Sequence, residues 1–227
     1  MALAPHAVDR SVYTRTAIIL HWAIALLLLF NIGFGFFMEG FAPPLRGVVV
    51  PLHISAGITV LALTLVRVLW RLLHAPPPYP ADMKRWERDA AHIAHFLLYA
   101  AMVLMPLTGW AIISAHPPAG SPGAVVEARS MPAPPPNAPR GRSVMKIWGV
   151  VPLPSIRPIQ AIGASAGGVE PQKELHDEFV AWHSLGGWIL IALLVLHIAG
   201  ALKHQILDRH AELARMGIGK AGPVAAD

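Results

Sequence analysis

The chain has 227 residues, of which 55% are hydrophobic and only 14% are charged, and its formal net charge is +5. It contains no cysteine, which excludes disulfides, thiolate-bound zinc, iron–sulfur clusters and haem attached through a Cys-x-x-Cys-His motif. Membrane proteins are typically basic in the connections that remain on the cytoplasmic side. The positive net charge therefore has an explanation other than binding to nucleic acid, which is not an expected partner.

Four apolar stretches are long enough to cross a membrane. They cover approximately residues 17–38, 49–73, 91–115 and 180–206, and a spanning helix needs about 20 residues. Within lipid every backbone polar group must be bonded inside the segment, so these stretches are expected to be helices. The sequence predicts an all-α, multi-pass membrane protein in which a four-helix bundle forms one domain over residues 1–227.

Basic residues indicate how this bundle is oriented. They gather before the first helix, around the second connection and after the last helix, whereas the first connection contains only Arg46. Positively charged connections stay on the cytoplasmic side, so both termini are predicted to be cytoplasmic. The third connection, residues 116–179, also carries basic residues, but long loops are translocated largely regardless of charge, and it is expected outside.

The third connection is unusual in composition. Residues 117–139 are rich in proline, glycine, alanine and serine and are expected to be irregular or polyproline-like. Residues 145–154 are apolar but too short to span, which favours an interfacial segment with Trp148 at the level of the lipid headgroups. The glycine-rich residues 163–168 follow no predicted strand and are not expected to open a helix.

Two histidines in the last apolar stretch are the main functional signal. His183 and His197 are fourteen residues apart, which is close to four helical turns, so both point to nearly the same face about 21 Å apart. Because the hydrocarbon core is about 30 Å thick, one imidazole is expected near each side. Imidazole is unfavourable in lipid unless it is paired or ligated.

Depth in the membrane predicts how the histidines pair. His21 lies about one turn into the first helix, on the inner side, and His53 opens the second helix, on the outer side. The pairs matched in depth are therefore His21 with His197 and His53 with His183. Two imidazoles facing each other in an apolar bundle suit a b-type haem that transfers electrons and has no open position on iron.

Other residues compete for these roles or support them. A single membrane histidine is more often a hydrogen-bonding residue than a metal ligand. His95 is an alternative ligand on the inner side, although a supporting or quinone-binding role fits it better. His176 competes with His183 but is expected at or beyond the interface. Gly57 is expected to allow close helix packing, with clearance of a flat macrocycle as the alternative. Arg67 and Arg71, on the inner side, either reach lipid phosphates or offset the charge of haem propionates.

Several motifs together resemble the bacterial cytochrome b561 family, which is similar to the cytochrome b subunits of nickel–iron hydrogenases. The resemblance implies a bacterial inner-membrane location, two haem b groups bound by His21, His53, His183 and His197, and electron exchange with quinone. The extended proline-rich third connection departs from the family pattern. The motifs are Leu20-His21-Trp22, Leu52-His53-Ile54-Ser55-Ala56-Gly57, Val66-Arg67-Val68-Leu69-Trp70-Arg71, Ala91-His92-Ile93-Ala94-His95, Met105-Pro106-Leu107-Thr108-Gly109-Trp110 and Leu196-His197-Ile198-Ala199-Gly200.

The expected function is transmembrane electron transfer between a quinone such as ubiquinone and an outer redox partner. Arg67, Arg71, His92 and His95 are expected to hydrogen-bond the quinone. The expected outer partner is a redox protein or superoxide. Superoxide is included because one branch of the family resembles a superoxide:quinone oxidoreductase. Whether the chain is itself an enzyme is left open. The alternative is a haem-free membrane scaffold or transporter that uses histidine for zinc or copper. Basic residues of the third connection would either attract an anion such as superoxide or only solvate the loop and contact lipid headgroups. They are Arg140, Arg142, Lys146, Arg157 and Lys173.

Overall fold

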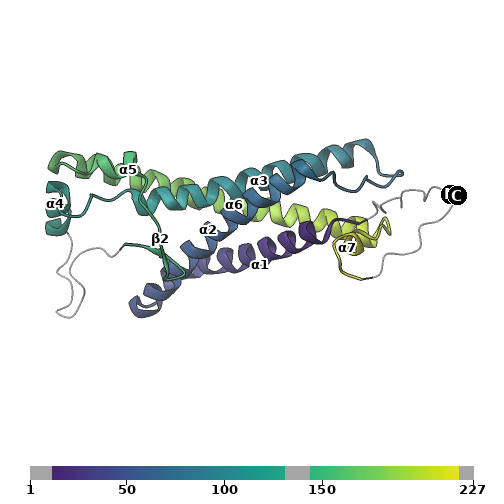
Figure 1. Cartoon of the computed structure of the whole chain (residues 1–227), viewed down its shortest axis with the longest axis horizontal. Coiled ribbons are helices and arrows are strands. Elements are labelled where there is room, and N and C mark those ends of the chain that lie inside the picture. The colour runs from purple at the N-terminus through teal and green to yellow at the C-terminus, as the bar shows by residue number, and fades with distance from the viewer. Residues whose placement is uncertain (1–11, 131–143, 220–227) are drawn as a thin grey trace, which may run out of the picture.

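Four long helices lie side by side in an elongated bundle (Figure 1). The computed structural model describes residues 12–130 and 144–219. The long helices are α1 (Arg15–Phe37), α2 (Pro43–Leu73), α3 (Arg85–Ser114) and α6 (Val169–Ile206). All four are long and apolar enough to cross a membrane, so the prediction of an all-α protein with four long apolar helices is confirmed.

Three of these helices begin six or more residues earlier than the apolar stretches that predicted them. α2 begins at Pro43, α3 at Arg85 and α6 at Val169, where the sequence predicted starts at residues 49, 91 and 180. Helical hydrogen bonding continues through polar residues, whereas the prediction followed only the apolar part. The additional turn of α3 is capped by Glu87, whose carboxylate accepts a hydrogen bond from the backbone N–H of Lys84 at 3.2 Å.

The two ends of the bundle differ in what covers them. Close packing joins α1 to α2, α2 to α3 and α3 to α6. We call the end where α1 begins and α6 ends the tail end, because the short helix α7 (Glu212–Arg215) lies there (Figure 1). We call the opposite end the loop end; it carries the 3-10 turn η1 (Met38–Gly40) and the elements of the third connection.

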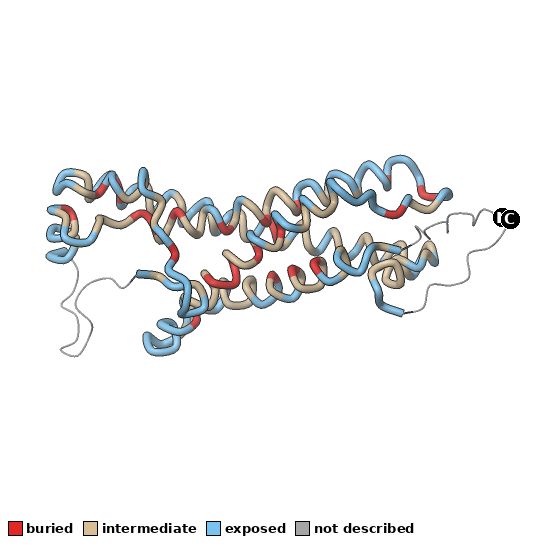
Figure 2. Tube along the Cα trace, viewed as in Figure 1, coloured by how far each residue is buried: buried red, intermediate tan, exposed pale blue. Residues whose placement is uncertain are grey.

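The bundle is apolar both inside and outside. Its core is formed by Ile24, Leu28, Val60, Met102 and Leu190, together with Leu98. Buried positions lie mainly along the facing sides of the helices, and the outward sides are exposed (Figure 2). Many exposed side chains on all four long helices are large and apolar. Such a surface is suited to lipid rather than to water.

The third connection contains more regular structure than its composition predicts. α4 (Pro122–Ser130) occupies part of the segment expected to be irregular, because Ser121 Oγ accepts a hydrogen bond from Ala124 N at 3.1 Å and helix-forming residues follow. The rest of that segment, residues 131–139, lies outside the described residues, as do Arg140 and Arg142. Further along are α5 (Arg157–Ile162) and the 3-10 turn η2 (Ala166–Gly168).

The glycine-rich residues 163–168 lead directly into α6, so the expectation that they open no helix was wrong. Gln172, in the first turn of α6, is 1% exposed, and its amide nitrogen donates to the carbonyl oxygens of Ile159 and Gln160 at 3.0 and 3.2 Å. A side chain at Gly163 would overlap the Gln172 amide. The glycine therefore allows α5 to pack on the start of α6, which apolar periodicity does not reveal.

The apolar segment around Trp148 forms a small hairpin. β1 (Lys146–Ile147) pairs antiparallel with β2 (Val151–Pro152). Trp148 has a φ of 51°, an unfavourable conformation for a bulky residue. It is held there because its backbone N–H donates to Ser55 Oγ at 2.9 Å and its indole N–H donates to Thr59 Oγ1 at 3.0 Å. The segment expected at the interface is thus fastened to the loop end of α2.

Ser114 fastens another part of the third connection, and replacing it tests that role. Its side chain is 1% exposed, donates to Trp110 O at 2.7 Å and accepts from Ile156 N at 3.0 Å. We expect Ser114→Ala to lower the free energy of unfolding by about 1 kcal/mol, because the half-buried N–H of Ile156 loses its acceptor. Thermal unfolding in detergent measures the change. Ser184→Ala, at an exposed position of α6, is the control; equal melting temperatures for the two variants would contradict the prediction.

Candidate functional site

The structure brings together both histidine pairs that the sequence predicts. Near the loop end, the ring centroids of His53 on α2 and His183 on α6 are 6.1 Å apart, with ring planes at 78°. Near the tail end, the ring centroids of His21 on α1 and His197 on α6 are 6.2 Å apart, with ring planes at 64°. One helix, α6, thus contributes one imidazole to each pair.

These separations fit the axial ligation of a metal by two imidazoles. Two imidazoles bound to opposite sides of one metal atom through bonds of about 2.0 Å place their ring centroids roughly 6.3 Å apart. Both observed separations are close to this value. In addition, α6 is not among the helices that pack closely on α1 or α2, so each pair joins helices whose backbones are held apart. The residues present therefore fit a haem at each pair.

Hydrogen bonds fix the protonation of the rings at the loop end. His53 Nδ1 lies 3.1 Å from the carbonyl oxygen of Asn31, which can only accept. His183 Nδ1 lies 2.9 Å from the hydroxyl oxygen of Thr108, and that hydroxyl donates its own hydrogen to Met105 O at 2.8 Å. Both rings therefore carry the proton on Nδ1 and keep the lone pair on Nε2 free. Orientation of this kind is typical of histidines that bind metals.

Two glycines make room for these rings. A Cβ atom at Gly35 would lie 3.1 Å from Cε1 of His53, and one at Gly109 would lie 3.2 Å from Cε1 of His183. A Cβ atom at Gly57 would lie 3.4 Å from Nδ2 of Asn31 on α1, which agrees with the close helix packing expected for this glycine. The roles of Gly35 and Gly109 were missed from sequence, because spacing along one helix does not show which ring on a neighbouring helix a glycine faces.

The tail-end pair has a third imidazole beside it. The ring of His95 on α3 lies 5.2 Å from that of His197, about 1 Å less than a shared axial metal requires. His95 Nδ1 donates to the carbonyl oxygen of Ala91 at 2.7 Å, so its Nε2 is also free. The separations favour His21 over His95 as the partner of His197, and they make His95 a neighbour of the pair.

Arg67 ties three helices together beside the same pair. Its Nε donates to the hydroxyl of Tyr99 on α3 at 3.1 Å, and its NH1 donates to the carbonyl oxygen of Ala17 on α1 at 2.6 Å. Ala17 is one helical turn before His21. The guanidinium therefore lies at the start of α1, at the same depth as the tail-end imidazoles, as the sequence predicted.

A cavity of about 380 Å³ opens at the tail end between the start of α1 and the end of α2. Aromatic and basic side chains line it, among them Tyr13, Arg67, Trp70, Arg71 and His74. The four residues expected to bind quinone are not gathered there. Arg67 and Arg71 line the cavity, whereas His95 faces His197 and His92 packs edge-on against Tyr79 at 5.2 Å.

His176 does not belong to either pair. It lies on the part of α6 that extends beyond the apolar stretch, where its ring is 5.4 Å from that of His116 and its Nδ1 is 3.0 Å from Asp177 Oδ1. His183, rather than His176, is the α6 histidine that faces His53.

Comparisons with known proteins match the chain to one family and to several relatives. The sequence profile of one family, described as prokaryotic cytochrome b561, matches residues 12–219. The chain is 41% identical to cytochrome b562 of Cereibacter sphaeroides over 103 residues, which are 43% of this chain and 63% of that protein. It is 28% identical to probable superoxide oxidase CybB of Yersinia pestis over 102 residues, 44% of this chain and 57% of that protein.

A third relative matches over a longer region. Cytochrome b561 homolog 2 of Escherichia coli is 26% identical over 170 residues, which are 75% of this chain and 70% of that protein. The matches to the first two relatives span less than two thirds of the length of those proteins.

Proposed function

Because the family profile covers residues 12–219, the chain belongs to the prokaryotic cytochrome b561 family, and we propose that it carries electrons across a membrane between a quinone and a redox partner on the opposite side. Membership implies a multi-pass membrane cytochrome containing haem b. The proposal adds two haems per chain, one at each histidine pair. The two matched ring separations, 6.1 and 6.2 Å, are the observation that carries it.

Two histidine pairs and the residues around them would hold the two haems. His53 and His183 bind one haem, and His21 and His197 bind the other. A haem held by two imidazoles supplies a one-electron carrier without an open position on its iron. Asn31 and Thr108 hold the loop-end imidazoles in the required orientation, and the bundle keeps water away. His183 and His197 are spaced about 21 Å apart along α6, so one haem site would lie in each half of the membrane.

The tail end is proposed to face the cytoplasm of a bacterial inner membrane. Basic side chains are concentrated there, and short connections rich in lysine and arginine remain inside. Both termini would then be cytoplasmic, and α4, α5 and the hairpin would lie outside. The basic residues at the tail end include Arg15, Arg71, Lys84, Arg85, Arg88, Lys203, Arg209 and Arg215.

The tail-end cavity is the proposed quinone site. Arg67 already donates hydrogen bonds to Tyr99 and Ala17. Arg71 is therefore the arginine proposed to donate a hydrogen bond to a quinone carbonyl. Trp70 and Tyr13 supply flat apolar walls for the ring. The cavity is next to Arg67 and therefore close to the tail-end histidine pair, which would allow electrons to pass between quinone and the inner haem.

Quinone titration of the reduced protein tests the proposal. Purified protein should show haem absorption bands, and a ubiquinone analogue should reoxidise the reduced form rapidly in stopped-flow measurements. We expect Arg71→Gln to slow this step about tenfold, because one charge-assisted hydrogen bond of about 1.5 kcal/mol is lost. Arg88→Gln, at an exposed tail-end residue outside the cavity lining, should leave the rate unchanged.

Two outcomes would contradict the proposal. A colourless protein that binds zinc or copper would support the haem-free scaffold or transporter instead. Reoxidation that no quinone accelerates would place protein partners at both ends.

Superoxide is a second candidate for the electron donor at the loop end. The observation that favours it is the similarity to a protein named probable superoxide oxidase. Haem reduction by pulsed superoxide, compared with reduction by a small redox protein, distinguishes the two donors. A rate that falls with added salt would favour the anion, since attraction by basic residues is screened.

A further inference from the structure

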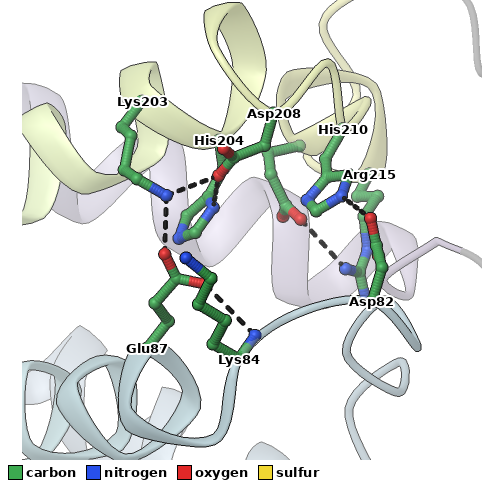
Figure 3. Close-up of polar contacts among 9 residues, drawn as sticks. Asp82, Lys84, Glu87, Lys203, His204, Asp208, His210 and Arg215 are labelled. Carbon is green, nitrogen blue, oxygen red and sulfur yellow. Dashed lines mark hydrogen bonds and ion pairs between the residues drawn. The ribbon is translucent and has the colours of Figure 1, made fainter.

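Three side chains of the types that can bind metals lie together at the tail end, outside both histidine pairs. His204 is in the last turn of α6, Asp208 follows the helix, and His210 begins the segment that leads to α7 (Figure 3). One ligand atom from each of these three residues lies within 4.8 Å of the others. None of them has a role in the proposed electron transfer.

The backbone turns back to bring these residues together. Arg209 has a φ of 59°, a left-handed conformation that is unfavourable for arginine. The turn is closed by a hydrogen bond from His210 N to His204 O of 2.9 Å. As a result the two imidazoles lie nearly parallel, with ring planes at 13° and centroids 6.0 Å apart.

Hydrogen bonds leave the His210 ring ready to bind a metal through Nδ1. His210 Nε2 lies 3.0 Å from Asp82 Oδ2. An aspartate is ionised at neutral pH and its oxygens can only accept hydrogen bonds, so Nε2 carries the proton and Nδ1 keeps its lone pair. That Nδ1 is buried and has no hydrogen-bond partner among the described residues. A carboxylate behind a metal-binding imidazole is a common arrangement.

The carboxylate of Asp208 is shared between a cation and an imidazole. Lys203 Nζ and His204 Nδ1 both lie 2.6 Å from its Oδ2. Lys203 also donates to Glu87 Oε1 at 2.7 Å, so one ammonium is offset by two carboxylates. These contacts use Oδ2, and Oδ1 of Asp208 is the second oxygen that the carboxylate can offer.

A polar cavity gives an ion access to this group. Its volume is about 190 Å³, and its lining includes Asp82, Lys84, Glu87, Asp208 and His210. Lys203 lines the cavity as well, so three carboxylates face two lysines and leave one net negative charge when His210 is neutral. This excess of negative charge favours a cation over an anion.

We propose that His204, Asp208 and His210 bind one divalent transition-metal ion of the Zn²⁺ class. Two imidazole nitrogens and one carboxylate oxygen are ligands that Zn²⁺ accepts, and three protein ligands leave one position for water. The ion joins the end of α6 to the segment that follows it, and Asp82 connects that segment to the loop between α2 and α3. The segment also reaches α1, because Trp22 Nε1 donates to Met216 O at 2.9 Å.

Zinc binding to the full, haem-loaded chain without an affinity tag tests the proposal. Equilibrium dialysis against zinc chloride, with metal measured by mass spectrometry, should give one tightly bound ion per chain. His204→Ala and His210→Ala should each weaken binding by at least about 100-fold, and Asp82→Asn by about 10-fold, since it only orients His210. The double variant His116→Ala/His176→Ala, at a pair of neighbouring imidazoles in the loop-end half of the molecule, should retain the ion.

A second measurement locates the ion. Zinc should slow tryptic cleavage after Arg209 in the unmodified chain and in the His116→Ala/His176→Ala variant, but not in His204→Ala. Equal zinc affinity in the His204→Ala, His210→Ala and unmodified proteins would overturn the proposal. It would also fail if zinc left cleavage after Arg209 unchanged. Neither result depends on haem content or on quinone turnover, so failure here is distinguishable from failure of the proposed function.

Discussion

Alanine in place of His183 is expected to remove the loop-end haem and to leave the tail-end haem bound. The variant loses one of the two imidazoles whose rings are 6.1 Å apart, while His21 and His197 are untouched. Haem content should fall from two groups per chain to about one, because a b-type haem held by a single imidazole is weakly retained. Quantitation of extracted haem and reduced-minus-oxidised visible spectra measure this result. His53→Ala should give the same product.

Two variants show whether the pairing itself is correct. His176→Ala, on the same helix but facing His116, should keep both haems. His95→Ala should also keep both, since its ring is too close to His197 to share an axial metal with it. If His183→Ala retained two haems with unchanged spectra, the loop-end pair would not be a haem site. If His95→Ala lost the tail-end haem and His21→Ala did not, His95 would be the inner ligand.

Leucine in place of Gly109 is expected to disrupt the same loop-end site without removing a ligand. Its Cβ atom would lie 3.2 Å from Cε1 of His183, and the rest of the side chain would need further space beside the ring. Displacing the ring also separates Nδ1 from Thr108, which holds it at 2.9 Å. A misplacement of about 1 Å loosens a metal site whose supporting contacts are lost, so occupancy of the loop-end haem should fall by half or more.

Gly33→Leu is the matched control for that variant. Gly33 is also a glycine within a spanning helix, but a Cβ atom there meets nothing within 4 Å. Haem quantitation and the reduced spectrum should therefore match those of the unmodified protein. Loss of haem from both variants to the same extent would indicate a general effect of bulky residues in the bundle, rather than displacement of the His183 ring.

The sequence predicted the four spanning helices because membrane-length apolar stretches have few alternative structures. It also predicted which histidines lie together, since helix direction and spacing determine depth. His95 shows the limit of that reasoning, because depth alone places three imidazoles at the tail end and only the ring separations distinguish them. The orientation of His183 by Thr108 could not be predicted, since it depends on how α3 and α6 are rotated relative to each other.

The structure of the third connection was harder to predict for a different reason. Its elements depend on contacts between residues distant in sequence, such as Trp148 with Ser55 and Thr59. Composition is a local property and does not report such contacts. In the same way, the early start of α6 depends on the hydrogen bond from the Gln172 side chain to α5. The apolar stretch that begins at residue 180 carries no information about that contact.

The contribution of α6 to both sites restricts how the gene for this protein can change in length. One helix fixes both the spacing and the relative rotation of His183 and His197, and each added residue turns a helix by about 100°. Insertion or deletion of a single codon between them would therefore turn one imidazole away from its partner while the other stayed in place. Codons for residues 131–143, between α4 and the hairpin, carry no such restriction from the two sites. Natural variation in length should accumulate there and be excluded from residues 184–196.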